Sequence, residues 1–477
     1  MNFEPHYASL HPCPTSRQEV KEGAPMAGNR PHVLAVPLPA QGHVKPLMSL
    51  CRQIAKHGIK VTFVNAESIH HKILSASPQQ DEDDSIVMET VPDGFTPEDD
   101  PNNPFTLLET LPKTMPQSLT DLIQRINSSN PNEKVTCLIA DLSFYWIFDT
   151  ADKMGVEPVG FSPPSVACLA FLLHAPKLLE QGNLNINGSL HNGDAISLSN
   201  DIPSWRKDDL PWSFSGDPKT EKVFFEIVKG YKEASKAKWW LCNSCHELEP
   251  AATELLPNVL TIGPLNLLDN NVKSTNFFSE DLSSLCWLNA QADGSVVYVS
   301  FGSLAVFSQQ QLDELALGLE LSGRAFLWVV RPDLANGSRV VYPPGFGIGL
   351  GKIVEWAPQN RVLSHPSIGC FVSHCGWNST IEGVSNGVPF ICWSYFADQL
   401  HNERYICEKW GIGLKIDFDE KGIRSRYEIK NKIDMLFSDK KFKENALKLK
   451  ELCSKSVADG GTSCNNLKKF IDHLHRK

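Results

Sequence analysis

The sequence predicts an α/β protein made of two Rossmann-like halves. Short apolar runs that suit buried strands alternate with stretches of helical period, and this alternation starts near residue 31 and again near residue 283. The 477 residues also exceed the length of one ordinary domain. We therefore expect a first domain over 31–264, a linker over 265–282 and a second domain over 283–457. A closing helix over 458–477 is expected to pack back on the first domain.

The first half opens with a β-α-β unit. His32–Pro37 is a short apolar strand, a helix is expected from about Val44 to His57, and Ile59–Val64 is the next strand. Such a unit implies parallel strands joined by a right-handed crossover. His43 would then stand just past the carboxyl end of a strand, where open α/β sheets bind ligands.

A second polar residue is expected at the same edge of the first sheet. After a long helix over about Phe105–Ser128, the buried strand Val135–Ala140 ends at Asp141, whose charge needs a partner or an opening to solvent. Bonded to one nitrogen of His43, this carboxylate would fix the imidazole tautomer and leave the other nitrogen as a base. Because no Gly-x-Ser-x-Gly motif supplies a serine to activate, the proton should come from a substrate.

The second half repeats the alternation, with a strong strand over Ser295–Phe301, a turn at Gly302-Ser303 and an amphipathic helix. Further on, the apolar run Gly369–Ser373 leads into a glycine-containing turn, and helical periodicity starts at Asn378. A strand, such a turn and a helix N-terminus together offer free backbone N–H groups and a positive dipole end to an anion. The stretch 356–399 is therefore interpreted as a cradle for a nucleotide diphosphate.

Side chains of matching chemistry lie within this cradle. The indole of Trp356 can stack on a nucleobase for about 1–3 kcal/mol, although an isolated Trp is more often part of a core. Glu382 follows Asn378 by four residues and Ser379 by three, so it shares their helix face and can accept hydrogen bonds from ribose hydroxyls. The pair Asp398-Gln399 follows an apolar strand and suits the vicinal hydroxyls of a sugar.

The composition excludes several other classes of protein. A net charge of -10 gives no basic surface for nucleic acid or an anionic membrane. No apolar run reaches the roughly 18–20 residues of a membrane helix. Residues 1–30 are polar and lack the apolar core of a signal peptide, so a disordered extension is expected there. The 13 scattered cysteines suit buried thiols in a reducing compartment, which favours the cytoplasm.

Three local features are rejected as functional sites. The glycine-rich stretch Gly345–Lys352 matches neither a P-loop nor the Gly-x-Gly-x-x-Gly of dinucleotide sites, so a dehydrogenase is not supported. The acidic clusters Asp81–Asp84 and Glu98–Asp100 contain no His or Cys, and no metal is expected there. The single Cys-x-x-Cys, Cys242–Cys245, has no second ligand pair.

The stretch 356–399 resembles, almost completely, the 44-residue signature of plant secondary-product UDP-glycosyltransferases of the inverting family 1. The shared motifs are Trp-Ala-Pro-Gln, His-Cys-Gly-Trp-Asn-Ser, the following Glu and the closing Asp-Gln. The resemblance includes Pro-Leu-Pro-Ala-Gln-Gly-His at 37–43 and Val-Tyr-Val-Ser-Phe-Gly-Ser at 297–303, and it covers 31–477. It implies the GT-B fold, in which two facing Rossmann-like domains hold the acceptor on the N-terminal side of a cleft and the UDP-sugar on the C-terminal side.

The resemblance also implies a role for each residue. His43 would be the general base and Asp141 its orienting partner, with one displacement on an α-linked donor giving a β-glucoside. The departing charge would be met by the helix N-terminus and His374, so neither a metal nor another cofactor is expected. The donor contacts implied, from base to sugar, are Trp356 and the Ala357 backbone on uracil, Gln359 and Glu382 on ribose, His374, Asn378, Ser379 and Ser303 on the diphosphate, and Trp377, Asp398 and Gln399 on the hexose.

The Trp at 377 and the final Gln at 399 resemble the pattern of glucose-using members, so a monomeric UDP-glucose-dependent enzyme is expected. Its small acceptor would lie against Phe144–Phe148, the helix near Ser165–Leu173 and the irregular insertion Gly182–Gly216. Phenol, alcohol, carboxylic acid and amine acceptors all stay open. A catalytically silent nucleotide-sugar-binding protein is the alternative, although both members of the expected catalytic pair are present.

Two places differ from the family pattern. The loop Tyr342–Lys352 is shorter and less charged than usual, and Ser394-Tyr395 replaces a commoner pair of the Pro-Phe type near the sugar.

Overall fold

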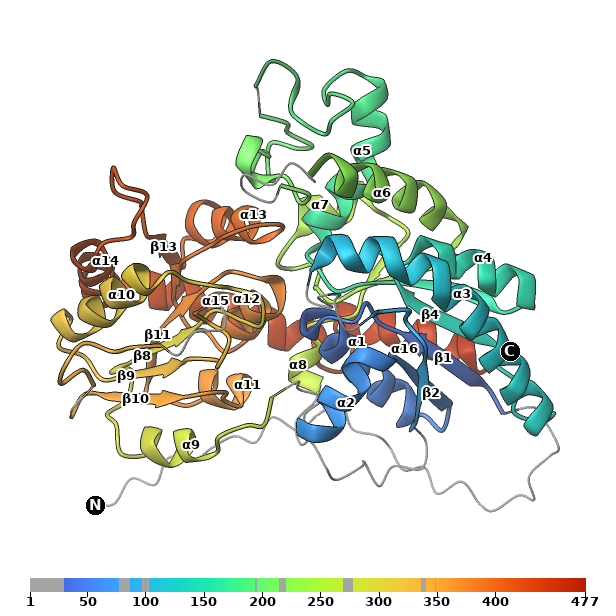
Figure 1. Ribbon diagram of the computed structural model, residues 1–477, viewed down its shortest axis with the longest axis horizontal. Coiled ribbons are helices and arrows are strands. Elements are labelled where there is room, and N and C mark those ends of the chain that lie inside the picture. The colour runs from blue at the N-terminus through green and yellow to red at the C-terminus, as the bar shows by residue number, and fades with distance from the viewer. Residues whose placement is uncertain are drawn as a thin grey trace.

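The chain folds into two lobes that lie side by side (Figure 1). The computed structural model describes residues 30–76, 86–96, 99, 103–193, 195–213, 220–268, 278–335, 340–347 and 349–477. The expected N-terminal extension, apart from Arg30, lies outside these residues, as do Asp81–Asp84, most of Glu98–Asp100 and the centre of the expected linker.

The N-terminal lobe is built on a seven-stranded parallel sheet in the order β3-β2-β1-β4-β5-β6-β7. The order reverses between β1 and β4, where Val36 pairs with Ala140. The crevice outside the carboxyl ends of the strands at such a reversal is where open α/β sheets bind ligands. Its strands are β1 His32–Val36, β2 Lys60–Ala66, β3 Ile86–Val91, β4 Cys137–Asp141, β5 Glu157–Ser162, β6 Trp239–Cys242 and β7 Val259–Thr261.

Helices cover both faces of this sheet because alternate strand residues are apolar on each side. Leu34 and Val36 of β1 pack in one buried cluster, whereas Val33 and Ala35 pack in another. The helices of this lobe are α1 Gln41–Ala55, α2 Glu67–Ala76, α3 Pro104–Ser129, α4 Tyr145–Met154, α5 Val166–Glu180, α6 Thr220–Glu233, α7 Pro250–Leu255 and α8 Leu265–Leu268, with short turns η1 His191–Gly193, η2 Lys207–Asp209 and η3 Ala234–Lys236.

Helix α1 begins earlier than the sequence suggested. Its N-cap is Ala40, whose carbonyl accepts the backbone N–H groups of His43 and Val44. His43 therefore lies in the first helical turn and not in the preceding loop. The helix holds its imidazole in a fixed direction at the end of β1, which a mobile loop would not do.

The C-terminal lobe repeats the arrangement with a six-stranded parallel sheet in the order β10-β9-β8-β11-β12-β13. Its order reverses between β8 and β11, where Ser300 pairs with Ser373. Strand β10 was not predicted, because it is a short edge strand that starts at Gly351 after a glycine-rich turn. The strands are β8 Val296–Ser300, β9 Phe326–Val329, β10 Gly351–Val354, β11 Ile368–Ser373, β12 Phe390–Cys392 and β13 Gly413–Lys415.

One helix of the C-terminal third leaves its lobe. Helix α16 contributes Leu467, Phe470, Ile471 and Leu474 to the cluster that covers Val33 in the N-terminal sheet. In Figure 1 it lies behind β1 and β4, as red ribbon behind blue. The helices from residue 283 onward are α9 Ser283–Leu288, α10 Gln309–Leu321, α11 Gln359–Leu363, α12 Trp377–Ser385, α13 Gln399–Arg404 with the π-helical turn η4 Tyr405–Lys409, α14 Arg426–Ser438, α15 Lys440–Val457 and α16 Thr462–Leu474.

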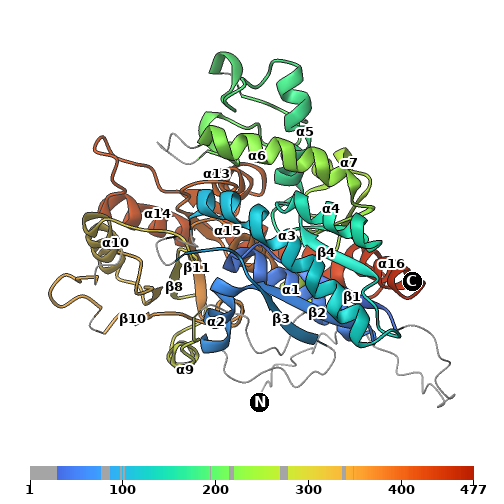
Figure 2. The ribbon, with the colours of Figure 1, turned by 45° about the vertical axis from the view of Figure 1, so that its right-hand side comes forward.

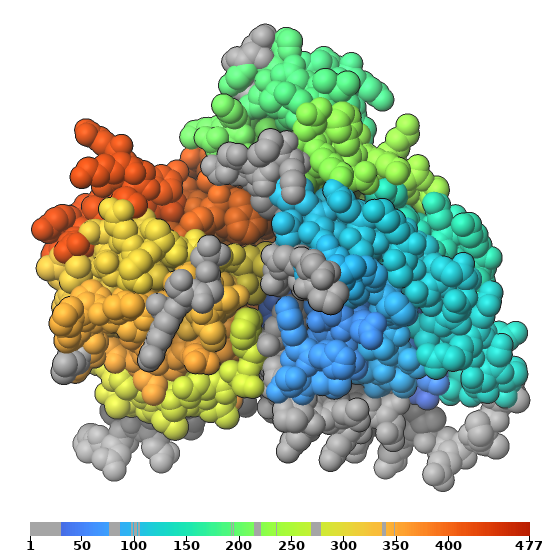
Figure 3. All heavy atoms as spheres, in the orientation of Figure 1, coloured from blue at the N-terminus to red at the C-terminus, as the bar shows by residue number. Residues whose placement is uncertain are grey.

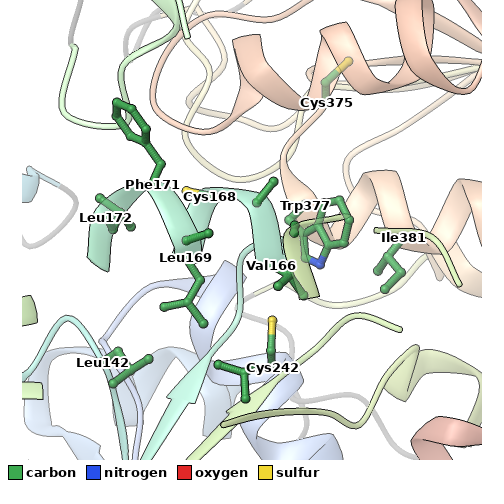
Figure 4. Packing of buried hydrophobic residues seen from close by; sticks show 14 of the residues in the cluster. Leu142, Val166, Cys168, Leu169, Phe171, Leu172, Cys242, Cys375, Trp377 and Ile381 are labelled. Carbon is green, nitrogen blue, oxygen red and sulfur yellow. The ribbon is translucent and has the colours of Figure 1, made fainter. Parts of the chain in front are cut away.

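The two lobes meet over a broad area (Figure 3) and share buried apolar residues. Figure 4 shows Trp377 and Ile381 of α12 on one side of this contact and Val166 and Cys242 of the N-terminal lobe on the other. Among the described residues, no helix is long and apolar enough to cross a membrane.

Candidate active site

His43 and Asp141 meet at the reversal point of the N-terminal sheet. His43 comes from the first turn of α1 and Asp141 from the last residue of β4, and the two parallel strands bring them to one edge. The Nδ1–H of His43 donates to Oδ2 of Asp141 over 2.6 Å. The other carboxylate oxygen accepts the backbone N–H of Ser143. Asp141 is buried while His43 keeps some exposure, so Nε2 is the ring nitrogen left to act as a base.

The environment of His43 favours its protonated form. Burial alone would lower the pKa of His43, but the charge and hydrogen bond of Asp141, with a smaller effect of Asp398, hold that pKa above its ordinary 6.5. Asp398 belongs to the other lobe, so both lobes act on this imidazole.

The reversal point of the C-terminal sheet carries Ser303 after β8 and His374 after β11. The imidazole of His374 is held between two glycines, because a Cβ at Gly302 or at Gly376 would lie 2.7 or 2.5 Å from its atoms. Burial and the nearby Arg331 lower the pKa of His374 to about 4, so the ring is neutral at pH 7.

Arg331 is a buried residue that the sequence analysis did not identify. Its guanidinium donates to the carbonyls of Gly302 and Ala305 over 2.9 and 2.6 Å, and so fixes the loop that contains Ser303. The side chain is 2% exposed. Sequence reasoning missed it because it follows β9, outside the 356–399 stretch.

Glu382 is the centre of a polar network on α12. Its Oε2 accepts a hydrogen bond from the amide of Gln359 over 2.8 Å, and the same amide donates to Ser379 over 2.9 Å. The Gln359 oxygen accepts from the hydroxyl of Tyr298. Three residues predicted to contact the donor are thus held in one arrangement by their neighbours.

Two hydrogen bonds join the lobes directly at these residues. Lys45 of α1 donates to Oε1 of Glu382 over 2.6 Å, and Asn378 donates to the carbonyl of Gly42 over 2.6 Å. The first turn of α1 therefore faces the first turns of α12. His43, the predicted general base, lies on the α1 side, and the predicted diphosphate residues lie on the α12 side. Lys45 had not been predicted, since nothing in a local pattern reveals a partner 337 positions away.

The indole of Trp356, which is predicted to stack on the nucleobase, contacts another aromatic ring in this structure. Phe278 stacks on Trp356, with ring centroids 4.8 Å apart and planes 30° apart. Trp356 is partly buried, and Ala357, whose backbone was expected at the base edge, is buried beside it. The indole can therefore accept a flat group in parallel contact.

The pair Asp398-Gln399 lies at the start of α13. Asp398 accepts a hydrogen bond from Asn402 over 2.9 Å, and the oxygen of Gln399 accepts the backbone N–H of Tyr395 over 3.0 Å. Burial raises the pKa of Asp398, while Asn402, the charge of His43 and the backbone of Trp377 oppose that rise. The structure brings Asp398 close enough to the imidazole of His43 for each charge to affect the pKa of the other group.

The side chain of Trp377 is placed differently from the other predicted donor residues. Its ring is 4% exposed, and its Nε1–H donates to the carbonyl of Asn243 in the N-terminal lobe over 2.8 Å. The indole therefore joins the lobes, while the backbone N–H of Trp377 bonds to the carboxylate of Asp398. The expected contact of Trp377 with a hexose stays a prediction.

The region predicted for the acceptor lies on the N-terminal side. Phe144 and Phe148 are buried, and α5 is almost wholly apolar. Residue 194 and residues 214–216 of the insertion Gly182–Gly216 lie outside the described residues. A surface cavity of about 300 Å³ lies between the end of α5 and residues 183–198, with His174 and Lys177 in its wall.

The structure has two parallel sheets whose reversal points face each other. One carries a His–Asp pair and the other a buried polar cradle, and this arrangement defines the GT-B class of glycosyltransferase. The chain belongs to the plant UDP-glycosyltransferases. The profile described as "UDP-glucoronosyl and UDP-glucosyl transferase" matches residues 219–456, and that described as "Glycosyltransferase, N-terminal domain" matches residues 30–184.

Characterised relatives and solved structures agree with this assignment. UDP-glycosyltransferase 83A1 of Arabidopsis thaliana is 40% identical over 93% of this chain and 97% of its own length. A 7-deoxyloganetin glucosyltransferase of Catharanthus roseus is 33% identical over 94% and 97%. Among solved structures, Os79 from O. sativa in complex with UDP superposes with a TM-score of 0.76 at 28% identity, over 93% of this chain and 100% of that one. A UDP-glucosyltransferase from Polygonum tinctorium capable of glucosylating indoxyl gives 0.79 at 28%, over 95% and 100%.

The family assignment settles the class of reaction. The protein is a hexosyltransferase that uses a nucleotide-sugar donor and a small-molecule acceptor, like the plant enzymes it matches.

Proposed function

We propose that the protein transfers glucose from UDP-glucose to a hydroxyl or carboxyl group of a small, mostly apolar metabolite, with inversion at the anomeric carbon. The 2.6 Å hydrogen bond between His43 and Asp141 carries this proposal. It gives the N-terminal side of the cleft an oriented base, and the donor residues of α12 face that base across Gly42 and Asn378.

The proposed reaction is one displacement. For a hydroxyl acceptor, Nε2 of His43 takes the proton while the acceptor oxygen forms a bond to the anomeric carbon. The bond from that carbon to the phosphate oxygen breaks, and UDP leaves with the electron pair. Asp141 stabilises the imidazolium that forms, which is the role the raised pKa of His43 supports. An α-linked donor then yields a β-glucoside.

The proposed donor site runs along 356–399. Trp356 stacks on uracil beside Ala357, while Gln359 and Glu382 receive the ribose. The hexose lies at Asp398 and Gln399. The diphosphate lies at the reversal point of the C-terminal sheet, where the positive end of the α12 dipole stabilises its negative charge. Its contacts there are Ser303, His374, Asn378 and Ser379.

Ribose would bind a carboxylate that already has partners. Both oxygens of Glu382 already carry hydrogen bonds, one from Lys45 and one from Gln359. Each carboxylate oxygen can accept a second hydrogen bond, so the ribose hydroxyls either share these oxygens with Lys45 and Gln359 or displace one of them. This places Lys45 next to the donor, although no local sequence motif includes it.

We further propose that catalysis uses no metal or other cofactor, that the protein acts as a monomer, and that it works in the cytoplasm. The α12 dipole supports the first point. The free thiols of the buried cysteines, among them Cys51 and Cys370, support a reducing compartment. A fluorescent fusion that concentrated outside the cytoplasm would contradict the last point.

Product analysis tests the proposal. Purified protein is incubated with UDP-glucose and a panel of phenols, alcohols, acids and amines, and products are read by mass spectrometry and by the anomeric proton coupling. We expect a β-glucoside and an equal amount of UDP. A protein that binds UDP-glucose but releases no UDP with any acceptor would be the silent binding protein instead. Faster turnover with another UDP-sugar would correct the donor.

A further inference from the structure

A column of flat rings also joins the lobes. The indole of Trp205 lies between the ring of Phe171 on α5 and the imidazole of His401 on α13. The centroid distances are 4.4 and 4.0 Å, and the planes differ by 12° and 9°. All three side chains are buried. Trp205 thus has a parallel ring on each face, one from each lobe.

The imidazole of His401 is oriented by a hydrogen bond to the same segment. Its Nε2 lies 2.8 Å from the carbonyl of Pro203. Burial lowers the pKa of His401 to about 3, so the ring is neutral at pH 7 and Nε2–H is the donor. The stack and the hydrogen bond together leave the ring one orientation.

Charged groups fasten the same two segments together. Arg404 pairs with Asp209 over 3.2 Å and also donates to the carbonyl of Ser204. Lys409 pairs with Asp201 over 2.9 Å. Residues 201–209 of the N-terminal lobe are therefore held along α13 and η4 of the C-terminal lobe. In Figure 2, α13 lies just below α6, with which α5 packs, and α13 also contacts η2.

The two ends of the column lie on elements of different function. Helix α13 starts at Gln399, two residues before His401, and so carries the proposed hexose contact. Helix α5 carries Phe171 and supplies the expected wall of the acceptor pocket. A change in the thickness of the column would move this wall relative to the hexose, and a displacement of about 1 Å between reacting groups can cost 10²-fold in rate.

We propose that Trp205 and His401 are positioning residues that determine acceptor selectivity, because their stack sets the spacing between the acceptor wall on α5 and the sugar end of α13. The inference rests on the proposed function. It assigns to the insertion a role in acceptor choice through a contact between lobes, and neither residue needs to touch the acceptor.

The test compares variants in their use of UDP-glucose with 4-methylumbelliferone, 1-naphthol and quercetin as acceptors. Trp205→Ala and His401→Ala should raise the acceptor KM at least about fivefold and reorder the three acceptors. The KM for UDP-glucose and the Kd for UDP should stay within about twofold, since no donor residue is touched. His401→Phe, which keeps a flat ring, should restore most of the acceptor preference.

Trp328→Phe is the matched control. Trp328 is a fully buried ring of the C-terminal sheet that packs edge-on against Tyr342 and Phe346, so its loss should lower thermal stability without changing acceptor order. If Trp205→Ala does not fold, Arg404→Gln loosens the same contact while leaving the rings in place.

Three outcomes would overturn the inference. The acceptor KM could stay unchanged in the His401 and Arg404 variants, the KM for donor and acceptor could rise equally, or His401→Phe could fail to restore the wild-type acceptor preference. The proposed function is tested separately by the wild-type protein. Failure of wild type to release UDP would sink that proposal, whereas normal wild-type turnover with variants that keep the wild-type acceptor KM and acceptor order would sink only this one.

Discussion

The two sides of the cleft present their polar groups in different ways. On the C-terminal side, the residues proposed for the donor come from 44 consecutive positions, together with Ser303, and hydrogen bonds link three of them, Gln359, Ser379 and Glu382. On the N-terminal side, His43 and Asp141 are 98 residues apart and meet only because β1 and β4 are neighbours. The region predicted for the acceptor is more dispersed still, since its residues come from α4, α5 and the insertion.

This difference separates binding from chemistry. The C-terminal side holds a preformed network that suits a constant ligand, the nucleotide. The N-terminal side holds the His43–Asp141 pair beside apolar helices, and those helices can vary in sequence without disturbing the pair. Each of the following changes should therefore affect one side and spare the other.

His43→Ala should produce the largest effect. Loss of a general base costs about 10²–10⁴-fold in turnover, and we expect a fall in this range with hydroxyl acceptors. UDP affinity, measured by calorimetry, should stay within about twofold because the donor network is untouched. His57→Ala, at the other end of α1, is the control. Unchanged turnover in the His43 variant would remove the base assigned to the N-terminal side.

Phe470→Ala should destabilise the N-terminal lobe although the residue lies in the last helix. The ring is fully buried against the N-terminal sheet, and such truncations cost about 3–5 kcal/mol of unfolding free energy. Hydrogen exchange should accelerate in β1 and β7 before β8 and β11. Leu447→Ala on α15, where the side chain is half exposed, should have little effect. Faster exchange in the C-terminal sheet first would assign α16 to the wrong lobe.

Trp356→Ala should weaken binding and leave the chemistry intact. Loss of stacking costs about 1–3 kcal/mol, which corresponds to roughly a 5- to 150-fold rise in the Kd for UDP. Turnover at saturating UDP-glucose should change far less. An unchanged Kd in a titration of UDP would show that uracil does not stack on the indole of Trp356.

Asp141→Asn should move the pH dependence of turnover. The base must be neutral, and the pKa of His43 is raised, so turnover should fall as the pH drops through a value above 6.5. Without the carboxylate charge that pKa falls, and the acid limb should shift to lower pH while the maximum rate also falls. The same ion pair stabilises the fold at low pH and ceases to do so as the pH rises through the raised pKa. Asp149→Asn, at the surface of α4, should leave the profile unchanged.

Chelation should have the smallest effect. If the α12 dipole and neutral polar groups carry the departing charge, EDTA should not change the rate with UDP-glucose. A loss of activity that Mg²⁺ or Mn²⁺ restores would mean that the donor side of the cleft is incomplete without a metal.

The sequence predicted the fold and indicated which residues to propose for the donor, because the information there is local. Strand periodicity, the Gly302-Ser303 turn and the spacing of Asn378 and Glu382 are visible within short windows. The pairing of Lys45 with Glu382 and the stacking of Trp205 on His401 are not, since each joins residues about two hundred or more positions apart through tertiary packing. Trp377 is a different case. Its place in the motif predicts a contact with the sugar, which stays a prediction, but the motif gave no sign that its indole bonds to Asn243 of the other lobe.

The passage of the chain into α16 gives the molecule two covalent links between its lobes. One runs from α8 to α9, and the other joins the end of α15 at Val457 to the start of α16 at Thr462. Two bodies tied at two points keep one easy rotation, about the line through both ties. Opening to admit a donor should therefore be a rotation about a single axis, in which Lys45 and Glu382 move apart.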